Sequence, residues 1–348
     1  MTEVWYVTRE AVVAAPDIKE TAQANAQVGR AIETSSRTVE ALCHRRFYPL
    51  REVRAFDWPQ PYSRSWRLWL DGNELLEAHS ITSGGVTLAP SEYLLRRSDG
   101  REGPATHIEI DLSQGGAWSA GSTHQRAILI DGTWGSWSAA VLAGSLAGAV
   151  ATTDGTQITV ANGSGVGVGD LLRVDDERMI VTDRRLADTG QDLGTALTAS
   201  AADTMFAVAD GAVFAPGEVL LIDAERMMVL DVAGDNLVVK RAFDGSVLAA
   251  HSTADIYAPR SLTVARGVLG TTAATHASAT PIARHTPPPL VRDLSLAGAV
   301  NQLLQESSGY ARTSGSGENA KEYGGRGLAK LREDCIRAHG RRLRARAI

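Results

Sequence analysis

The stretch "DDERMIVTD" at residues 175–183 returns 48 residues later as "DAERMMVLD" at residues 223–231. When residues 166–183 are aligned with residues 214–231, eight of eighteen positions are identical. Each copy has the pattern of a glycine turn, an apolar strand, a two-residue acidic turn and a return strand. Because a single hairpin cannot cover its own apolar face, a duplicated hairpin predicts a pseudo-symmetric, β-barrel-like domain.

A second repeat lies within the same region. Residues 239–254 match residues 264–279 at a spacing of 25, and the two copies share a histidine, His251 in one and His276 in the other. The sequence "TPPP" at 286–289 ends the region, because consecutive prolines cannot continue a strand. We therefore predict that residues 151–286 form an inserted, duplicated β domain.

The segments before this domain place the chain in the α+β class. Residues 1–50 have helical periodicity, with Thr8 as the cap of a short helix and Asp17 as the cap of a longer helix that ends near His44. Residues 51–150 alternate between polar and apolar side chains and contain Asp-Gly turns. That alternation predicts a small antiparallel β region.

The C-terminal part is predicted to be helical and basic. Residues 287–325 predict a core helix followed by a flexible glycine-rich linker. Residues 326–348 predict a last helix, in which eight Lys and Arg face two acidic residues, a net charge of +6. Its end is rich in arginine: Arg337, Arg341, Arg342, Arg344 and Arg346. This end is either a solvated helix terminus or a tail that docks on an acidic protein surface or near DNA phosphates. The linker favours docking, because it lets the helix reach away from its own domain.

Overall composition is that of a soluble globular protein, with 44% apolar and 22% charged residues. The net charge of −5 argues against a general binder of nucleic acid or membrane surfaces. Residues 151–285 carry ten basic and seventeen acidic residues, a net charge of −7. The acidic β domain and the basic C-terminal end should therefore seek different partners.

Cysteine and hydropathy patterns predict neither a metal site nor a membrane span. Cys43 and Cys335 are the only cysteines, and no CxxC or Cys/His cluster occurs. Two such thiols on predicted helices fit a reducing compartment, with a single disulfide as the alternative. No signal peptide is predicted, and no apolar run approaches the roughly 20 residues that a membrane span needs. We expect no cofactor.

Motifs that could carry catalysis have simpler structural interpretations. "GSGVGVGD" at 163–170 resembles a phosphate-binding loop, but a strand follows it rather than a helix, which favours a hairpin turn. The repetition of carboxylates at matching turn positions favours a structural role at hairpin tips, with Arg178 and Arg226 as cross-strand partners. These carboxylates are Asp175, Asp176, Glu177, Asp223 and Glu225. A weak divalent-cation site is the alternative.

His251 and His276 are expected to pin loops through hydrogen bonds, and a pair of ligands is the alternative. No nucleophile elbow and no coherent catalytic constellation is found, so we do not expect an enzyme.

Several stretches together resemble one family. "VGRAIETSSRTVEALCHRRFYP" at 28–49 resembles the helix and Arg-Phe-Tyr-Pro exit of head–tail connector (adaptor) proteins of long-tailed phages. "LWLDGNELLEAHSITSGGVTLAPSEYLLR" at 68–96 and "ILIDGTWG" at 128–135 resemble the β portion of longer members. "LLQESSGYARTSGSG" at 303–317 and the basic last helix are also similar to theirs. The doubled β insert departs from the minimal, all-helical connector.

The resemblance implies a structural protein of the virion neck, assembled in the host cytoplasm. It implies a homo-oligomeric ring of twelve copies beneath the portal protein, which lines the channel for packaged DNA and offers a platform to the next neck or tail-completion protein. The helices would form a connector core, the basic tail would wedge into the portal, and the β insert would point outward, where it could contact the capsid. The expected subunit-contact residues are Ile32, Val39, Leu42, Arg45, Arg46, Phe47 and Tyr48.

Two other functions are considered. One is a tail or baseplate β protein whose insert binds carbohydrate or the host surface, and the other is a glycan hydrolase, for which no carboxylate pair stands out. For a connector, we expect removal of residues 326–348 to leave the fold intact and abolish portal binding. We also expect excision of residues 154–285 to leave the ring intact.

Overall fold

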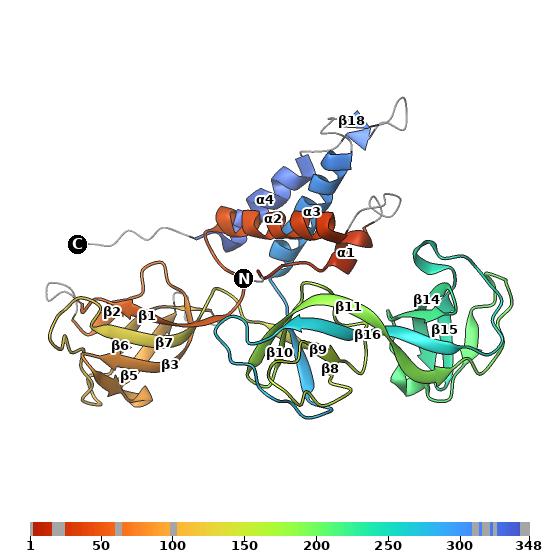
Figure 1. Cartoon of the computed structure of the whole chain (residues 1–348). Coiled ribbons are helices and arrows are strands. Elements are labelled where there is room, and N and C mark those ends of the chain that lie inside the picture. Colours follow the sequence, from red (N-terminus) through yellow and green to blue (C-terminus); the bar gives the residue numbers. More distant parts are fainter. Residues whose placement is uncertain are drawn as a thin grey trace.

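The computed structural model describes residues 3–15, 25–59, 65–97, 103–307, 313–314, 321–322 and 326–341. The chain is a mixed α+β protein in which strands predominate, so the predicted class is confirmed (Figure 1). Most strands belong to two antiparallel sheets, and the helices lie together along one side of them. A further short pair is formed by β18 (Thr313–Ser314) and β19 (Lys321–Glu322).

Four α-helices are described: α1 (Arg9–Val13), α2 (Asn25–Cys43), α3 (Pro289–Ser307) and α4 (Arg326–His339). Thr8 caps α1, since its side chain accepts a hydrogen bond from the Ala11 amide at 3.2 Å. The predicted start of the second helix at Asp17 lies outside the described residues. Helices α2 and α3 approach closely at Gly298 of α3, which has no side chain. A Cβ atom at this position would lie only 2.4 Å from Ser35 Oγ of α2.

The first sheet has the strand order β1-β7-β3-β6-β2, with β4 paired to β3 and β5 to β6. Its alternating pattern buries one face: Ile128 and Ile130 of β7 are fully buried, whereas Leu129 between them is 42% exposed. The strands are β1 (Leu50–Phe56), β2 (Arg67–Trp69), β3 (Leu75–Ser83), β4 (Val86–Leu88), β5 (Tyr93–Arg97), β6 (Ala105–Ile110) and β7 (Ile128–Trp134).

The second sheet has ten strands and contains the sequence repeats. Asp175 and Asp223, which begin the two repeated phrases, adopt the left-handed conformation at φ 50° and 52° and turn the chain between adjacent strands. The strands are β8 (Ala140–Ser145), β9 (Gln157–Thr159), β10 (Leu171–Val174), β11 (Glu177–Asp192), β12 (Met205–Ala207), β13 (Val219–Ile222), β14 (Glu225–Ala233), β15 (Asn236–Lys240), β16 (Asp255–Ala265) and β17 (Pro281–His285).

This sheet contains two modules with the same strand order. The proximal module comprises residues 140–185 and 261–285, and its strand order is β9-β16-β11-β10-β17-β8. The distal module comprises residues 186–260, and its strand order is β12-β15-β14-β13-β16-β11. The long strands β11 and β16 therefore belong to both modules (Figure 1). The pair Ile180↔Ala265 corresponds to the pair Met228↔Lys240, and the register shifts by one residue just after both. The duplication is thus nested: the distal module lies between two strands of the proximal one.

Contacts of the proximal module correct two expectations. The inserted domain does not begin at 151, because β8, which starts at Ala140, pairs with β17 of the same sheet. The domain is also not separable from the helices: Trp5 packs on the core of the proximal module, and the Arg9 amide donates to Val168 O at 3.0 Å. Excision of residues 154–285 would therefore expose the apolar surface of the helical part that packs against the proximal module. We no longer expect the remaining chain to be intact after this excision.

Candidate functional site

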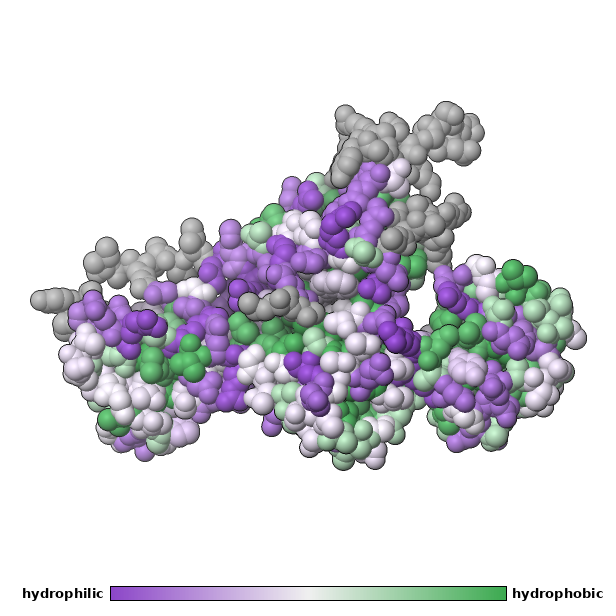
Figure 2. All heavy atoms as spheres, viewed as in Figure 1, coloured by the Kyte–Doolittle hydropathy of each residue, from purple (hydrophilic) through white to green (hydrophobic). Residues whose placement is uncertain are grey.

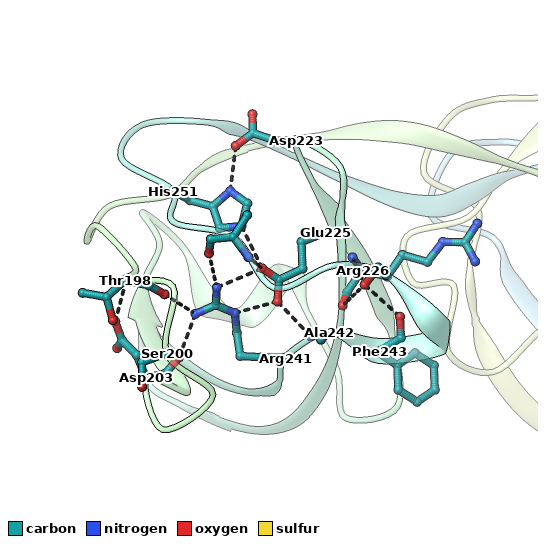
Figure 3. Close-up of polar contacts among 12 residues, drawn as sticks. Thr198, Ser200, Asp203, Asp223, Glu225, Arg226, Arg241, Ala242, Phe243 and His251 are labelled. Carbon is teal, nitrogen blue, oxygen red and sulfur yellow. Dashed lines mark hydrogen bonds and ion pairs between the residues drawn. The ribbon is translucent and has the colours of Figure 1, made fainter.

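A buried polar network lies in the distal module, where β14 begins (Figure 3). The Glu225 carboxylate accepts hydrogen bonds from Arg241 Nε at 2.8 Å and Arg241 Nη2 at 2.9 Å. It also accepts from His251 Nε2 at 3.0 Å and from the amides of Ala242 and Ala249 at 2.8 and 3.0 Å. Burial by itself raises the pKa of Glu225, but the bonds from Arg241 and His251 outweigh it and lower the pKa to about 2.

The proximal module contains the same network. Glu177 accepts from Arg266 Nε and Nη2 at 2.6 and 2.7 Å, and from His276 Nε2 at 2.9 Å. In each copy a second carboxylate contacts the other ring nitrogen: Asp175 lies 2.8 Å from His276 Nδ1, and Asp223 lies 2.7 Å from His251 Nδ1. Burial raises the pKa of Glu177, but the bond from Arg266 helps to lower it to about 2. Both networks tie strands to turns and are saturated by internal bonds.

The arginine partners differ from those that the sequence suggested. Arg178 and Arg226 each follow a network glutamate by one residue, and neighbouring side chains in a strand point to opposite faces. They therefore face away from Glu177 and Glu225, whose partners are Arg266 and Arg241. No group of His, Cys, Asp and Glu side chains in the described part of the chain is arranged to hold a metal ion.

The glycine-rich loop at 163–170 leads into strand β10 and not into a helix. Its amides bind the chain's own carboxylates: Gly167 N donates to Asp170 at 2.7 Å, and Val168 N donates to Glu10 at 2.8 Å. Burial raises the pKa of Asp170 to about 6. The loop therefore anchors α1, and these amides are not available to phosphate. The prediction of a hairpin turn is wrong, because the strands that the loop joins do not pair with each other: β9 pairs with β16, and β10 pairs with β11 and β17.

Basic side chains from distant segments line a cleft of about 540 Å³ between the ends of α2 and α4 and the first sheet. Arg341 joins the cleft through its amide, which donates to Cys43 O at 3.0 Å, and through its guanidinium, which donates to Gly72 O. The basic residues are Arg37, His44, Arg45, Arg46, Arg54 and Arg341. Arg45 and Arg46 thus line the same cleft as Arg341, the first arginine after α4.

Two carboxylates partly balance this charge. Glu74 lies 3.0 Å from Arg45 Nε, and Glu40 lies 3.1 Å from Arg37 Nη2. Burial raises the pKa of both carboxyl groups despite the neighbouring arginines. Arg46 remains exposed. Hydrophilic residues also dominate the visible surface of the helices above the sheets (Figure 2).

The residues expected at a subunit contact are mostly inside the chain. Ile32, Val39, Phe47 and Tyr48 are at most 7% exposed, and Leu42 packs against the same core. Helices α3 and α4 and the proximal module cover this face of α2. Its apolar stripe therefore needs no second subunit to be buried, and only Arg45 and Arg46 of this set contribute to a surface cleft.

The basic tail is partly described. Arg337 is exposed on α4 and Arg341 follows the helix, whereas Arg342, Arg344 and Arg346 lie outside the described residues, as does most of the predicted linker. Helix α4 does not reach away from its domain: Cys335 is fully buried against α2, and His339 packs edge-on against Phe47. Removal of residues 326–348 would therefore expose core, contrary to the expectation of an intact fold.

No protein-family model, no curated protein and no solved structure matches this chain. None of the described helices is long and apolar enough to cross a bilayer.

Proposed function

We propose that this protein is a structural head-to-tail adaptor of a long-tailed phage, which forms a ring beneath the portal and lines the DNA channel. In this proposal the packed helices α2, α3 and α4 are the connector core, and the nested β modules project from it. The observation that carries the proposal is the basic cleft, where Arg45, Arg46 and Arg341 converge beside the helices. Guanidinium groups in such a cleft suit acidic side chains of a docking partner or phosphates of DNA.

The buried networks support a scaffold rather than a catalyst. Glu177 and Glu225, whose pKa values are lowered to about 2, are fully buried and bonded to the chain's own donors, so they offer no free acid or base to a substrate. This arrangement joins strands to turns and stabilises the fold. It gives the glycan hydrolase hypothesis no support.

The test is light scattering of the purified protein, alone and mixed with the portal protein from the same genome. We expect a stoichiometric complex with the portal, which a double variant of the cleft, Arg46→Ala with Arg341→Ala, weakens. The matched control, Arg185→Ala with Arg292→Ala, removes two exposed arginines elsewhere and should leave the complex unchanged. Absence of any complex or ring at all concentrations would refute the proposal. A complex equally stable in both variants would refute the role of the cleft.

A further inference from the structure

A second charged groove lies between the first sheet and the proximal module. It has a volume of about 570 Å³, and its walls include Leu76 and Glu77 of β3, Trp137, and the paired strands β10 and β11. Its charged and titratable side chains are Glu77, Arg97, Arg173, Arg178 and His285. Among the described lining residues Glu77 is the only acid, so the groove is positively charged.

Arg178 is one of three arginines that line this groove. Its Nη1 atom is buried and has no hydrogen-bond partner within the described part of the chain. Arg173 lies directly opposite it in the β10–β11 ladder, and like charges in that position destabilise a sheet. Burial and the charges of Arg173 and Arg51 lower the pKa of Arg178, although Glu77 acts against them.

The distal module provides an internal comparison. There the equivalent arginine, Arg226, donates to Asp244 at 2.6 Å, and the residue opposite it in the ladder is Leu221. In the proximal module the position of Asp244 is occupied by Leu269, and that of Leu221 by Arg173. The turn itself is unchanged, since Asp244 and Leu269 have φ angles of 53° and 54°. Relative to the distal copy, one difference adds a positive charge beside Arg178 and the other removes a negative charge, so both make its surroundings more positive.

A buried guanidinium nitrogen without a hydrogen-bond partner is costly, and a second arginine opposite Arg178 makes the site less favourable still. The distal copy shows which group satisfies a guanidinium at this position, namely a carboxylate. We propose that the groove around Arg173 and Arg178 binds a carboxylate side chain supplied by an acidic segment of a partner protein. In the proximal module a partner thus provides the carboxylate that Asp244 provides in the distal module.

The shape of the groove favours a peptide over a small isolated anion. Trp137 forms part of the wall, and its indole is fixed by a hydrogen bond from Nε1 to Thr286 O at 2.7 Å. Leu76 and Ala283 add apolar surface beside the arginines. An extended acidic segment could place a carboxylate on the guanidinium groups and its aliphatic atoms on Trp137. This inference rests on the proposed adaptor function, which requires such partners.

The test is a fluorescence anisotropy titration of the full-length protein with a labelled, end-blocked oligoglutamate peptide, with oligoglutamine as the neutral comparison. We expect salt-sensitive binding of oligoglutamate only. Arg178→Gln and Arg173→Leu, the latter reproducing the distal residue, should each weaken binding roughly tenfold. Arg226→Gln is the matched control in the distal module and should not change binding. Leu269→Asp places a carboxylate at the position that Asp244 has in the distal module. This carboxylate should pair with Arg178 and so abolish peptide binding.

Several outcomes would overturn the inference. They are an absence of oligoglutamate binding, or equal binding by Arg178→Gln and wild type. Asp99 and Glu102 belong to the stretch 98–102, which is outside the described residues. If the peptide binds only after Asp99→Asn and Glu102→Gln, the chain supplies its own carboxylate and the inference is wrong. The cleft variant Arg46→Ala with Arg341→Ala should bind the peptide normally, which separates this test from that of the adaptor function.

Discussion

Glu225 and Arg241 form a fully buried ion pair in the distal module, with side chains 0% and 1% exposed and Arg241 Nε 2.8 Å from Glu225 Oε1. Burial of two charges is offset only when their remaining bonding capacity is filled. Here the guanidinium also donates to the carbonyls of Thr198, Asp203 and Ala249. The network thus ties Thr198, Asp203 and Ala249, which lie outside the strands, to the paired strands β14 and β15.

Loss of this pair should strongly destabilise the protein. Glu225→Gln leaves the Arg241 guanidinium buried without its counter-charge, and we expect it to lower the free energy of unfolding by about 3–5 kcal/mol. Urea unfolding followed by circular dichroism measures the loss. The control, Arg226→Gln, removes an ion pair whose side chains are 53% and 45% exposed, and it should change stability by less than about 1 kcal/mol. Equal effects of the two substitutions would contradict the structural role of the network.

The same glutamates predict how stability depends on acid. The pKa values of Glu177 and Glu225 fall from 4.5 to about 2 on folding, so each favours the folded state at neutral pH. That contribution is complete above pH 4.5 and is lost as the pH falls toward 2. We expect wild type to lose stability more steeply across this window than Glu225→Gln, because the variant has one fewer such carboxylate. Parallel curves of unfolding free energy against pH would contradict this expectation.

The sequence predicted the duplication because each hairpin repeat is local and its period is readable. It did not predict the nesting, since β11 and β16 are shared between modules only through pairing of residues as distant as Ile180 and Ala265. The network arginines were missed for a similar reason: Arg266 is far from Glu177 along the chain. A signal did exist, because Arg241 and Arg266 occupy matching positions of the second repeat.

The basic cleft depends on tertiary structure alone. Arg45 and Arg46 stood out at the helix exit and Arg341 in the basic tail, but nothing in their spacing indicated that one cleft contains all three. The long apolar stripe of α2 suggested a subunit neighbour, whereas α3 and α4 of the same chain cover Val39 and its neighbours. A hydrophobic pattern shows that a face is buried and does not identify what buries it.

The nesting predicts that the distal module can be removed without unfolding the proximal module. Arg185 pairs with Ser261, just as Ala233 pairs with Asn236 across the turn Gly234-Asp235. We expect a variant in which Gly-Asp replaces residues 186–260 to retain the helices, the first sheet and the proximal module. Hydrogen exchange of the β10 amides should remain as slow as in wild type. Excision of residues 154–285 is the comparison and should give an unfolded or aggregated protein; the opposite ranking would contradict the nested arrangement.

A pair of thiols lies at the contact between α4 and α2, and oxidation could join them in a disulfide bond. The Sγ atoms of Cys43 and Cys335 lie 3.8 Å apart, and both residues are fully buried. The hydrogen bond from Cys335 lowers the pKa of the Cys43 thiol, which makes Cys43 the nucleophile in an exchange reaction. Because a disulfide needs a sulfur separation of about 2 Å, a small shift of α4 suffices.

We therefore expect diamide, which accepts two electrons and two protons, to join Cys43 and Cys335. The disulfide would close almost the whole chain into a loop and should raise the free energy of unfolding by about 2–4 kcal/mol. Faster migration on a non-reducing gel, reversed by dithiothreitol, reports the bond, and urea unfolding reports the stabilisation. Cys335→Ser should show neither change. Since both thiols are buried, oxidation should be slow and should accelerate when urea loosens α4; a failure to cross-link even then would mean that α4 does not pack against α2 in solution.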